Sequence, residues 1–209
     1  LSPRWLEDEF HHAVIAFGGG ALLSAIGLVL VPEGIELVSP LTAAIAFASG
    51  GLAFFWFDGF LERHKTAAGQ LVAMLLDFLP EAVALGAALA MEKSTALLLA
   101  ILIGLQNTPE AFNSFREMRA STELSPGKIL GFFCLLALLG PVAAWAGVSF
   151  FVDHPIFLGS LMLFASGGIL YLTFEDIAPQ AVLKHHRLPA LGAVLGFLLG
   201  IIGAMLTGF

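Results

Sequence analysis

Long apolar stretches, separated by short polar connections, follow one another along the whole chain. A stretch of about 18 or more apolar residues is long enough for a helix to cross the hydrocarbon core of a bilayer. The pattern predicts an all-α integral membrane protein with a single transmembrane domain, residues 1–209. Its seven transmembrane helices are predicted at about 12–31, 41–61, 68–91, 95–115, 128–151, 156–181 and 189–209.

Composition agrees with this fold class and narrows the function. Of the 209 residues, 58% are hydrophobic and 12% are charged, whereas ordinary soluble domains carry about 25% charged residues. The sequence contains neither the GxxxxGK[ST] loop of ATP-driven machines nor the HExxH pattern of zinc proteases. We therefore expect no enzyme, no organic cofactor and no nucleic-acid partner, and we expect the lipid bilayer to surround the chain.

Basic residues are distributed unevenly between the two predicted sides. With the N-terminus in the cytoplasm, eight of the nine lysines and arginines fall in cytoplasmic segments, and only Lys93 falls outside. Such an excess is typical of cytoplasmic segments. We expect a cytoplasmic N-terminus and an outside C-terminus, in the plasma (inner) membrane. The single cysteine, Cys134, excludes an intrachain disulfide and is expected to serve packing.

Two of the predicted helices carry a Pro-Glu pair at their midpoint. Asp77 precedes Glu81 by four residues, and Gln106 precedes Glu110 by the same spacing. One helical turn therefore places both oxygen-bearing side chains of a pair on one face. The flanking residues are almost purely hydrocarbon, and a carboxylate at the centre of a membrane helix costs roughly 2.5–3.5 kcal/mol. We interpret each motif as one half of a cation site.

The two motif helices are predicted to run antiparallel, joined by a short turn at 92–94. Asp77 lies about nine residues from the inner end of its helix, and Gln106 lies about eleven from the outer end of the next. Both therefore reach the midplane, and two like motifs that approach it from opposite sides predict an inverted repeat. A second, weaker similarity supports the inverted repeat, because similar small-residue segments precede Pro32 and Pro179 by the same distance.

The acidic residues of the predicted helices form two layers. The midplane layer contains Asp77, Glu81 and Glu110, and the inner layer, nearer the cytoplasm, contains Asp58, Glu175 and Asp176. The sequence places no lysine or arginine at the midplane, so we expect these carboxylates to be protonated, hydrated or bound to metal, with protons and metal ions in competition. The inner layer is expected to draw a cation towards the cytoplasm. For Asp58, a simple contact between helices is an equal alternative.

Small residues gather in several predicted helices. Gly18–Gly20 and Gly50-Gly51 are compatible with packing inside the bundle and equally with a homodimer. The sequence Phe-Ala-Ser-Gly-Gly occurs twice, at Phe47–Gly51 and Phe164–Gly168, in helices predicted to run in the same direction.

The motifs resemble those of the ZIP (Zrt-/Irt-like) family of divalent metal transporters. Typical members carry His-Asn-x-Pro-Glu-Gly in the fourth span and His-x-x-Pro-Glu-Gly in the fifth, which correspond here to Asp77–Ala82 and Gln106–Ala111. Glu175 and Asp176, just before Pro179, resemble the acidic pair of the family's seventh span. The family has eight spans with both termini outside, so the resemblance implies a ZIP-like bundle that lacks the first span.

The resemblance also implies a ligand set and a function. Carried over by position, the metal site consists of Asp77, Glu81, Gln106, Asn107 and Glu110. The implied function is transport of a divalent cation towards the cytoplasm. Both motif histidines are replaced, and imidazole suits zinc whereas carboxylate and amide oxygens suit harder ions. We therefore expect a weaker zinc preference than in typical members, with zinc, manganese, iron(II), cobalt and cadmium as candidate substrates.

Other functions remain compatible with the sequence. A carboxylate-lined carrier of protons or organic cations needs no metal, and a transport-inactive ZIP relative or structural subunit would tolerate neutralised Glu81 and Glu110. An intramembrane aspartyl-type enzyme would have to join Asp77 and Asp176, whose predicted depths differ. Metal dependence distinguishes the main prediction from the first alternative.

Overall fold

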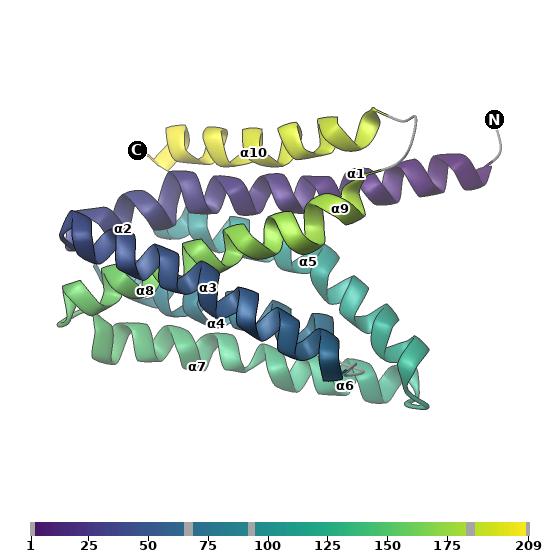
Figure 1. Ribbon diagram of the computed structural model, residues 1–209, viewed down its shortest axis with the longest axis horizontal. Coiled ribbons are helices and arrows are strands. Elements are labelled where there is room, and N and C mark those ends of the chain that lie inside the picture. The colour runs from purple at the N-terminus through teal and green to yellow at the C-terminus, as the bar shows by residue number, and fades with distance from the viewer. Residues whose placement is uncertain (1–2, 65–68, 92–94, 183–186, 208–209) are drawn as a thin grey trace.

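The computed structural model describes the backbone of residues 3–64, 69–91, 95–182 and 187–207. Within the helices, the description excludes the side chains of residues 3–8, 61–64, 69–70, 73, 77, 95, 106, 109, 113 and 207. The described residues form helices and short connections, with no strand among them, which confirms the predicted all-α class (Figure 1).

The described residues form α-helices and short π-helical turns. The α-helices are α1 (Pro3–Ala25), α2 (Val31–Leu37), α3 (Pro40–His64), α4 (Gly69–Ala90), α5 (Thr95–Ser121), α6 (Pro126–Ala137), α7 (Leu139–Ala146), α8 (Pro155–Leu172), α9 (Ala178–Ala181) and α10 (Leu188–Thr207). Three π-helical turns lie among the described residues: η1 (Ile26–Leu30) joins α1 to α2, η3 (Thr173–Ile177) joins α8 to α9, and η2 (Gly147–Phe151) extends the end of α7.

Five helical stretches of the described residues are long and apolar enough to cross a membrane. They are Glu9–Leu37, Pro40–Phe60, Pro126–Phe151, Pro155–Ala181 and Leu188–Leu206, and each overlaps one of the predicted spans. The two other predicted spans also form helices, α4 and α5. Both helices contain side chains that the structure does not describe, and the five stretches were found among described residues only. A bundle of seven spans therefore stays a prediction.

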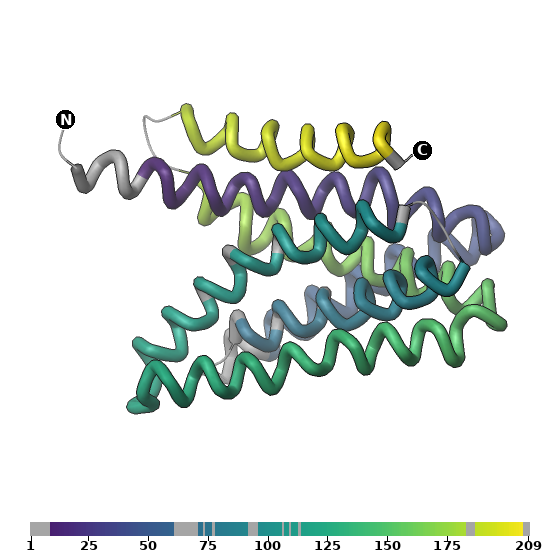
Figure 2. The backbone as a smooth tube through the Cα atoms, turned by 180° about the vertical axis from the view of Figure 1, so that it is seen from behind, coloured from purple at the N-terminus to yellow at the C-terminus, as the bar shows by residue number. Residues whose placement is uncertain are grey.

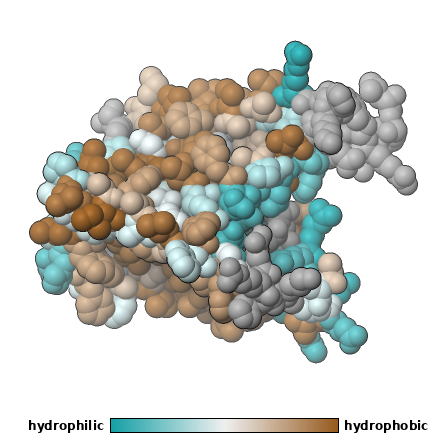
Figure 3. Space-filling view, in the orientation of Figure 1, coloured by the Kyte–Doolittle hydropathy of each residue, from teal (hydrophilic) through white to brown (hydrophobic). Residues whose placement is uncertain are grey.

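The outer surface of the bundle is apolar. Large hydrophobic side chains of α3 point outward, including Leu41, Phe55 and Trp56, the last of which is 74% exposed. Figure 3 shows hydrophobic residues over most of one face, with hydrophilic residues gathered towards the end where α3 and α9 finish. Such a surface suits a lipid environment, in which apolar side chains need no burial.

The helices pack in pairs that are nested along the chain. The first described helix, α1, packs against the last, α10; α3 packs against α8; and α4 packs against α7. Each pair runs in the same direction, as Figures 1 and 2 show from opposite sides. Helix α5 contacts α1, α4 and α10 and continues through a turn to α6. The three pairs join segments far apart in the sequence, and none of these pairings was predicted.

Glycines bring the paired backbones into direct contact. In the α3–α8 pair, Gly50 lies against the carbonyl of Phe164, and Gly167 lies against the carbonyl of Phe47. The fourth residue of each Phe-Ala-Ser-Gly-Gly sequence thus meets the first residue of the other, so the repeated sequence forms a reciprocal contact. Gly20 likewise lies against Ala193 of α10. These small-residue faces pack inside the chain, which was one of the two predicted alternatives.

Prolines explain the position of two π-helical turns. Turn η1 ends two residues before Pro32, and turn η3 ends two residues before Pro179. A proline offers no N–H to the carbonyl four residues earlier, and its ring crowds that carbonyl, so the preceding turn widens. The two segments that precede these prolines at equal spacing therefore share a local structure, a π-helical turn. The inverted repeat of whole halves stays a prediction.

The close contact at Gly50 predicts a sharp response to a single methyl group. Gly50→Ala would force Cβ into the Phe164 carbonyl, and overpacking of this kind typically costs about 1–3 kcal/mol. Unfolding of the purified protein in detergent should show this decrease in the free energy of unfolding. Gly59→Ala on the same helix is the matched control, because nothing lies within 4 Å of its side-chain position. Equal stability of the two variants would contradict the contact.

Candidate functional site

Glu81 lies completely buried in the middle of α4. Its side chain is 0% exposed, although the helix around it is almost entirely apolar. Neighbouring Ala82 and Ala84 are also buried, so this face of α4 points into the bundle. Burial of an acidic side chain is costly, and such residues inside membrane proteins are typically functional. The structure therefore places this predicted residue in the interior of the bundle, and its part in a midplane site stays a prediction.

The inward face of α5 carries a row of polar side chains. Asn107, Glu110 and Ser114 follow at helical spacing; Asn107 and Glu110 are half-buried and Ser114 is fully buried. The opposite face carries exposed Thr108 and Phe112. Because α4 packs directly on α5, the helices that carry the two motif glutamates are neighbours.

The polar atoms of this region differ in how they are satisfied. Nδ2 of Asn107 donates a hydrogen bond to the carbonyl of Ile103 at 2.8 Å, which ties the amide to its own helix. Three buried oxygens make no hydrogen bond to the described residues. They are Oε1 of Glu81, Oε2 of Glu110 and Oγ of Ser114. Both glutamates nevertheless take part in other interactions.

Two of the predicted ligands cannot be placed in the site. The side chains of Asp77 and Gln106 lie outside the described residues, although their backbones belong to α4 and α5. Among the described side chains, no group of three or more His, Cys, Asp or Glu residues is arranged to hold a metal ion. The predicted five-residue ligand set is therefore placed in part: Glu81, Asn107 and Glu110.

The prolines of the motifs do not interrupt their helices. Helix α4 continues through Pro80, and α5 continues through Pro109. Packing on both sides holds the helices together, while the missing N–H groups still leave the carbonyls of Leu76 and Leu105 without their usual helical donor. Backbone oxygens are thus available beside the motif glutamates without local unwinding.

The inner layer is built on the α3–α8 pair. The hydroxyl of Tyr171 on α8 donates a hydrogen bond to Oδ2 of Asp58 on α3 at 3.0 Å, and the Tyr171 ring lies edge-on to Phe55. Turn η3 carries Glu175, which is exposed, and Asp176, which is half-buried. Asp58 therefore has the contact between helices that the sequence offered as its alternative role.

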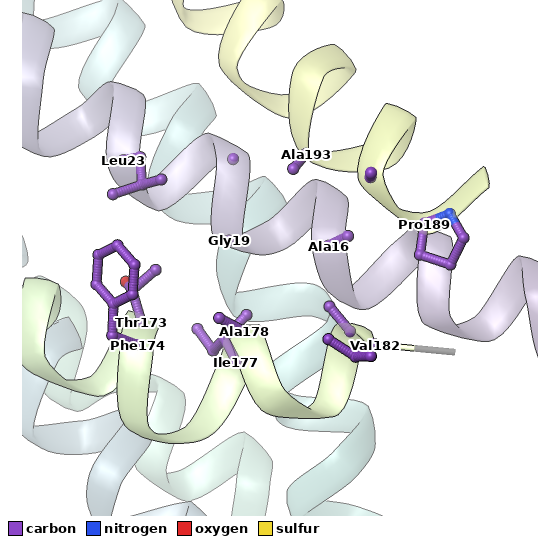
Figure 4. A pocket seen from close by; sticks show the side chains of 13 residues that line it. Ala16, Gly19, Leu23, Thr173, Phe174, Ile177, Ala178, Val182, Pro189 and Ala193 are labelled. Carbon is purple, nitrogen blue, oxygen red and sulfur yellow. The ribbon is translucent and has the colours of Figure 1, made fainter. Parts of the chain in front are cut away.

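A cavity of about 280 Å³ lies beside the inner layer, between α1, η3, α9 and α10 (Figure 4). Apolar side chains line it, among them Leu23, Phe174 and Ile177, and its single polar lining side chain is Thr173. The Thr173 hydroxyl donates to the carbonyl of Ile169 at 2.8 Å. No predicted site residue lines this cavity, and its apolar walls do not suit a cation.

Sequence reasoning missed Tyr171. It is the chain's single tyrosine, and it lies 16 residues after Pro155, much as Asp58 lies 18 residues after Pro40. Since both helices begin at those prolines and run in the same direction, the two side chains reach a similar depth. A lone phenol at the depth of a carboxylate was therefore a usable signal for a hydrogen bond between the helices.

Comparison with known proteins adds no identification: no protein-family model matches the chain, and no curated protein matches it. The resemblance to the ZIP family stays a prediction that rests on the two Pro-Glu motifs.

The contact between Tyr171 and Asp58 should be measurable as a coupling. In a double-mutant cycle of Tyr171→Phe and Asp58→Leu, unfolding in detergent should give a coupling free energy of about 0.6 kcal/mol, the average for hydrogen bonds between membrane helices. Phenylalanine keeps the ring beside Phe55, so the cycle isolates the hydroxyl. Strict additivity of the two substitutions would show that the hydrogen bond does not stabilise the pair.

Proposed function

We propose that the chain transports a divalent metal cation across a membrane, towards the cytoplasm, through a midplane site on α4 and α5. Glu81 and Glu110 coordinate the cation, and Asp77, Gln106 and Asn107 complete its oxygen shell. The inner layer of Asp58, Glu175 and Asp176 attracts it towards the cytoplasm. The cation is the substrate, and its gradient supplies the driving force.

The observation that carries this proposal is the complete burial of Glu81 at the centre of an apolar helix. Its neighbour α5 presents Glu110 on an inward polar row. From residue 69 to residue 115, the sequence has one basic residue, Lys93, in the connection between the two helices. A cation that binds at the midplane offsets the cost of placing carboxylates there.

The surroundings of the site favour a gated passage over an open pore. Near the ends of α4 and α5 that are predicted to be cytoplasmic, Leu71, Met118 and Ile129 form an apolar cluster with Phe115 and Phe133 packed against it. Such a constriction excludes water and ions until the helices separate. Passage of a cation past this cluster therefore requires movement of α5 or α6 relative to α4.

Flux measurements test the proposal directly. Purified protein in proteoliposomes should show saturable uptake of at least one of manganese, iron(II), cobalt, zinc and cadmium. Glu81→Gln and Glu110→Gln should each lower this flux at least about tenfold, because loss of even a supporting interaction at a metal site costs about 10–100-fold. Glutamine preserves size and burial, so folding should persist.

Glu123→Gln provides the matched control, since Glu123 is exposed in the connection between α5 and α6. Its flux should equal that of the parent protein. Uptake that survives neutralisation of both Glu81 and Glu110 would reject the midplane site. Absence of flux for every metal, from protein shown to be folded, would favour a carrier of protons or organic cations or a transport-inactive protein.

The oxygen-rich ligand set predicts the metal preference. The chain has no histidine between residues 65 and 153, so α4 and α5 offer no imidazole, the ligand that suits zinc. In competition assays, zinc should not clearly displace manganese. Gln106→His should raise the effectiveness of zinc severalfold relative to manganese. A strong preference for zinc in the parent protein would contradict this prediction.

A further inference from the structure

Four hydroxyl-bearing side chains are buried among the described residues: Ser24, Ser114, Ser166 and Thr173. Three of them donate a hydrogen bond to a carbonyl three or four residues earlier, with Ser24 bonded to Ala21 at 2.7 Å, Ser166 to Met162 at 2.7 Å and Thr173 to Ile169 at 2.8 Å. This is the usual way in which a helix satisfies a buried hydroxyl.

Ser114 departs from this pattern. Its side chain is 0% exposed, and its Oγ has no hydrogen-bond partner among the residues that the structure describes. A buried hydroxyl without a partner loses the hydrogen bonds that it had in water. Such a group in a native structure calls for an explanation, of which an absent ion or water is one.

The position of Ser114 on α5 points to an ion. The helix is uninterrupted, so Ser114 lies on the same face as Glu110 and about 6 Å farther along the axis. Met118, four residues further, belongs to the apolar cluster between α4, α5 and α6. Ser114 is therefore the last polar side chain of the row before the apolar constriction.

We propose that the Ser114 hydroxyl is a further oxygen ligand for the cation, one helical turn beyond Glu110 on its way to the apolar cluster. The inference rests on the proposed function, since it extends the same cation path. A hydroxyl oxygen offers lone pairs to a hard or borderline divalent cation. In this position it replaces part of the hydration shell that the cation loses between the midplane layer and the constriction.

A cysteine at this position converts the proposal into a spectroscopic test. Cys134 is exposed and is the chain's single cysteine, so Cys134→Ser gives a background without thiols. Ser114→Cys in this background should bind cadmium with the ultraviolet absorption of a cadmium–thiolate bond, because cadmium is a soft ion that favours sulfur. Binding is measured on folded protein in detergent, without transport.

Ser24→Cys in the same background is the matched control. Ser24 is equally buried, but it is bonded to its own helix and lies against Gly200 of α10. Cadmium should bind the Ser114→Cys protein at least about tenfold more tightly than the control. Equal or absent thiolate absorption in the two proteins would overturn the proposal.

Ser114→Ala provides a second, independent measurement. If Oγ has no protein partner, its removal should leave the unfolding temperature unchanged or raised while KM for manganese flux rises severalfold. A lowered unfolding temperature with unchanged KM would assign Ser114 a structural role and reject the proposal.

The two tests separate this inference from the proposed function. Cadmium–thiolate binding at Ser114→Cys without flux in the parent protein would support the ion position and reject transport. Flux that depends on Glu81 and Glu110, together with parental behaviour of both Ser114 variants, would support transport and reject the role of Ser114.

Discussion

Direct contact between helix backbones holds the bundle together. In the α1–α10, α3–α8 and α4–α7 pairs, a glycine of one helix lies against a carbonyl of the other, where a side chain would collide with the backbone. Lipid tails are as apolar as the helix surfaces, so the hydrophobic effect gives little reason for membrane helices to associate. Close van der Waals packing at small residues takes its place. The nested order of the pairs follows from where these glycines lie.

Helix α5 is held differently, and this matters for the site. Its single glycine, Gly104, has nothing within 4 Å of its side-chain position. On α4, by contrast, Gly86 lies against Ala144, and the carbonyl of Val83 lies against Gly147. Glu81 therefore belongs to a helix fixed by backbone contacts, whereas α5 packs through side chains, which permit the small sliding movements of helices past one another. The two motif helices are therefore held in the bundle by contacts of different kinds.

The sequence predicted much of the fold because membrane spans are set by length and hydrophobicity. The predicted span at about 156–181 lies within one residue of Pro155–Ala181, and the span at 41–61 is equally close to Pro40–Phe60. Helix pairing could not be predicted, because it depends on how small residues of distant segments meet in space. The Phe-Ala-Ser-Gly-Gly repeat shows this, since the sequence revealed two equal segments but not that they meet.

Some features of the candidate site could likewise be predicted from the sequence, and others could not. Burial of Glu81 and the inward position of Glu110 follow from a carboxylate's avoidance of lipid, which a single sequence reveals. The continuity of α4 through Pro80 and the hydrogen bond from Tyr171 to Asp58 depend on tertiary packing, which a single sequence does not reveal. Both motif helices were correctly expected to be neighbours, while the side chains of Asp77 and Gln106 lie outside the described residues.

The chemistry of the proposed ligands bears on whether a cation would pass or stay bound. A structural zinc site uses thiolates and imidazoles, which hold the ion tightly. Helices α4 and α5 contain no histidine, and Cys134 on α6 is exposed. Carboxylate, amide and hydroxyl oxygens bind borderline cations more weakly, and conduction requires sites that are favourable to enter yet weak enough to leave. An inward row of oxygens that ends at an apolar constriction therefore suits an ion in transit better than a resident one.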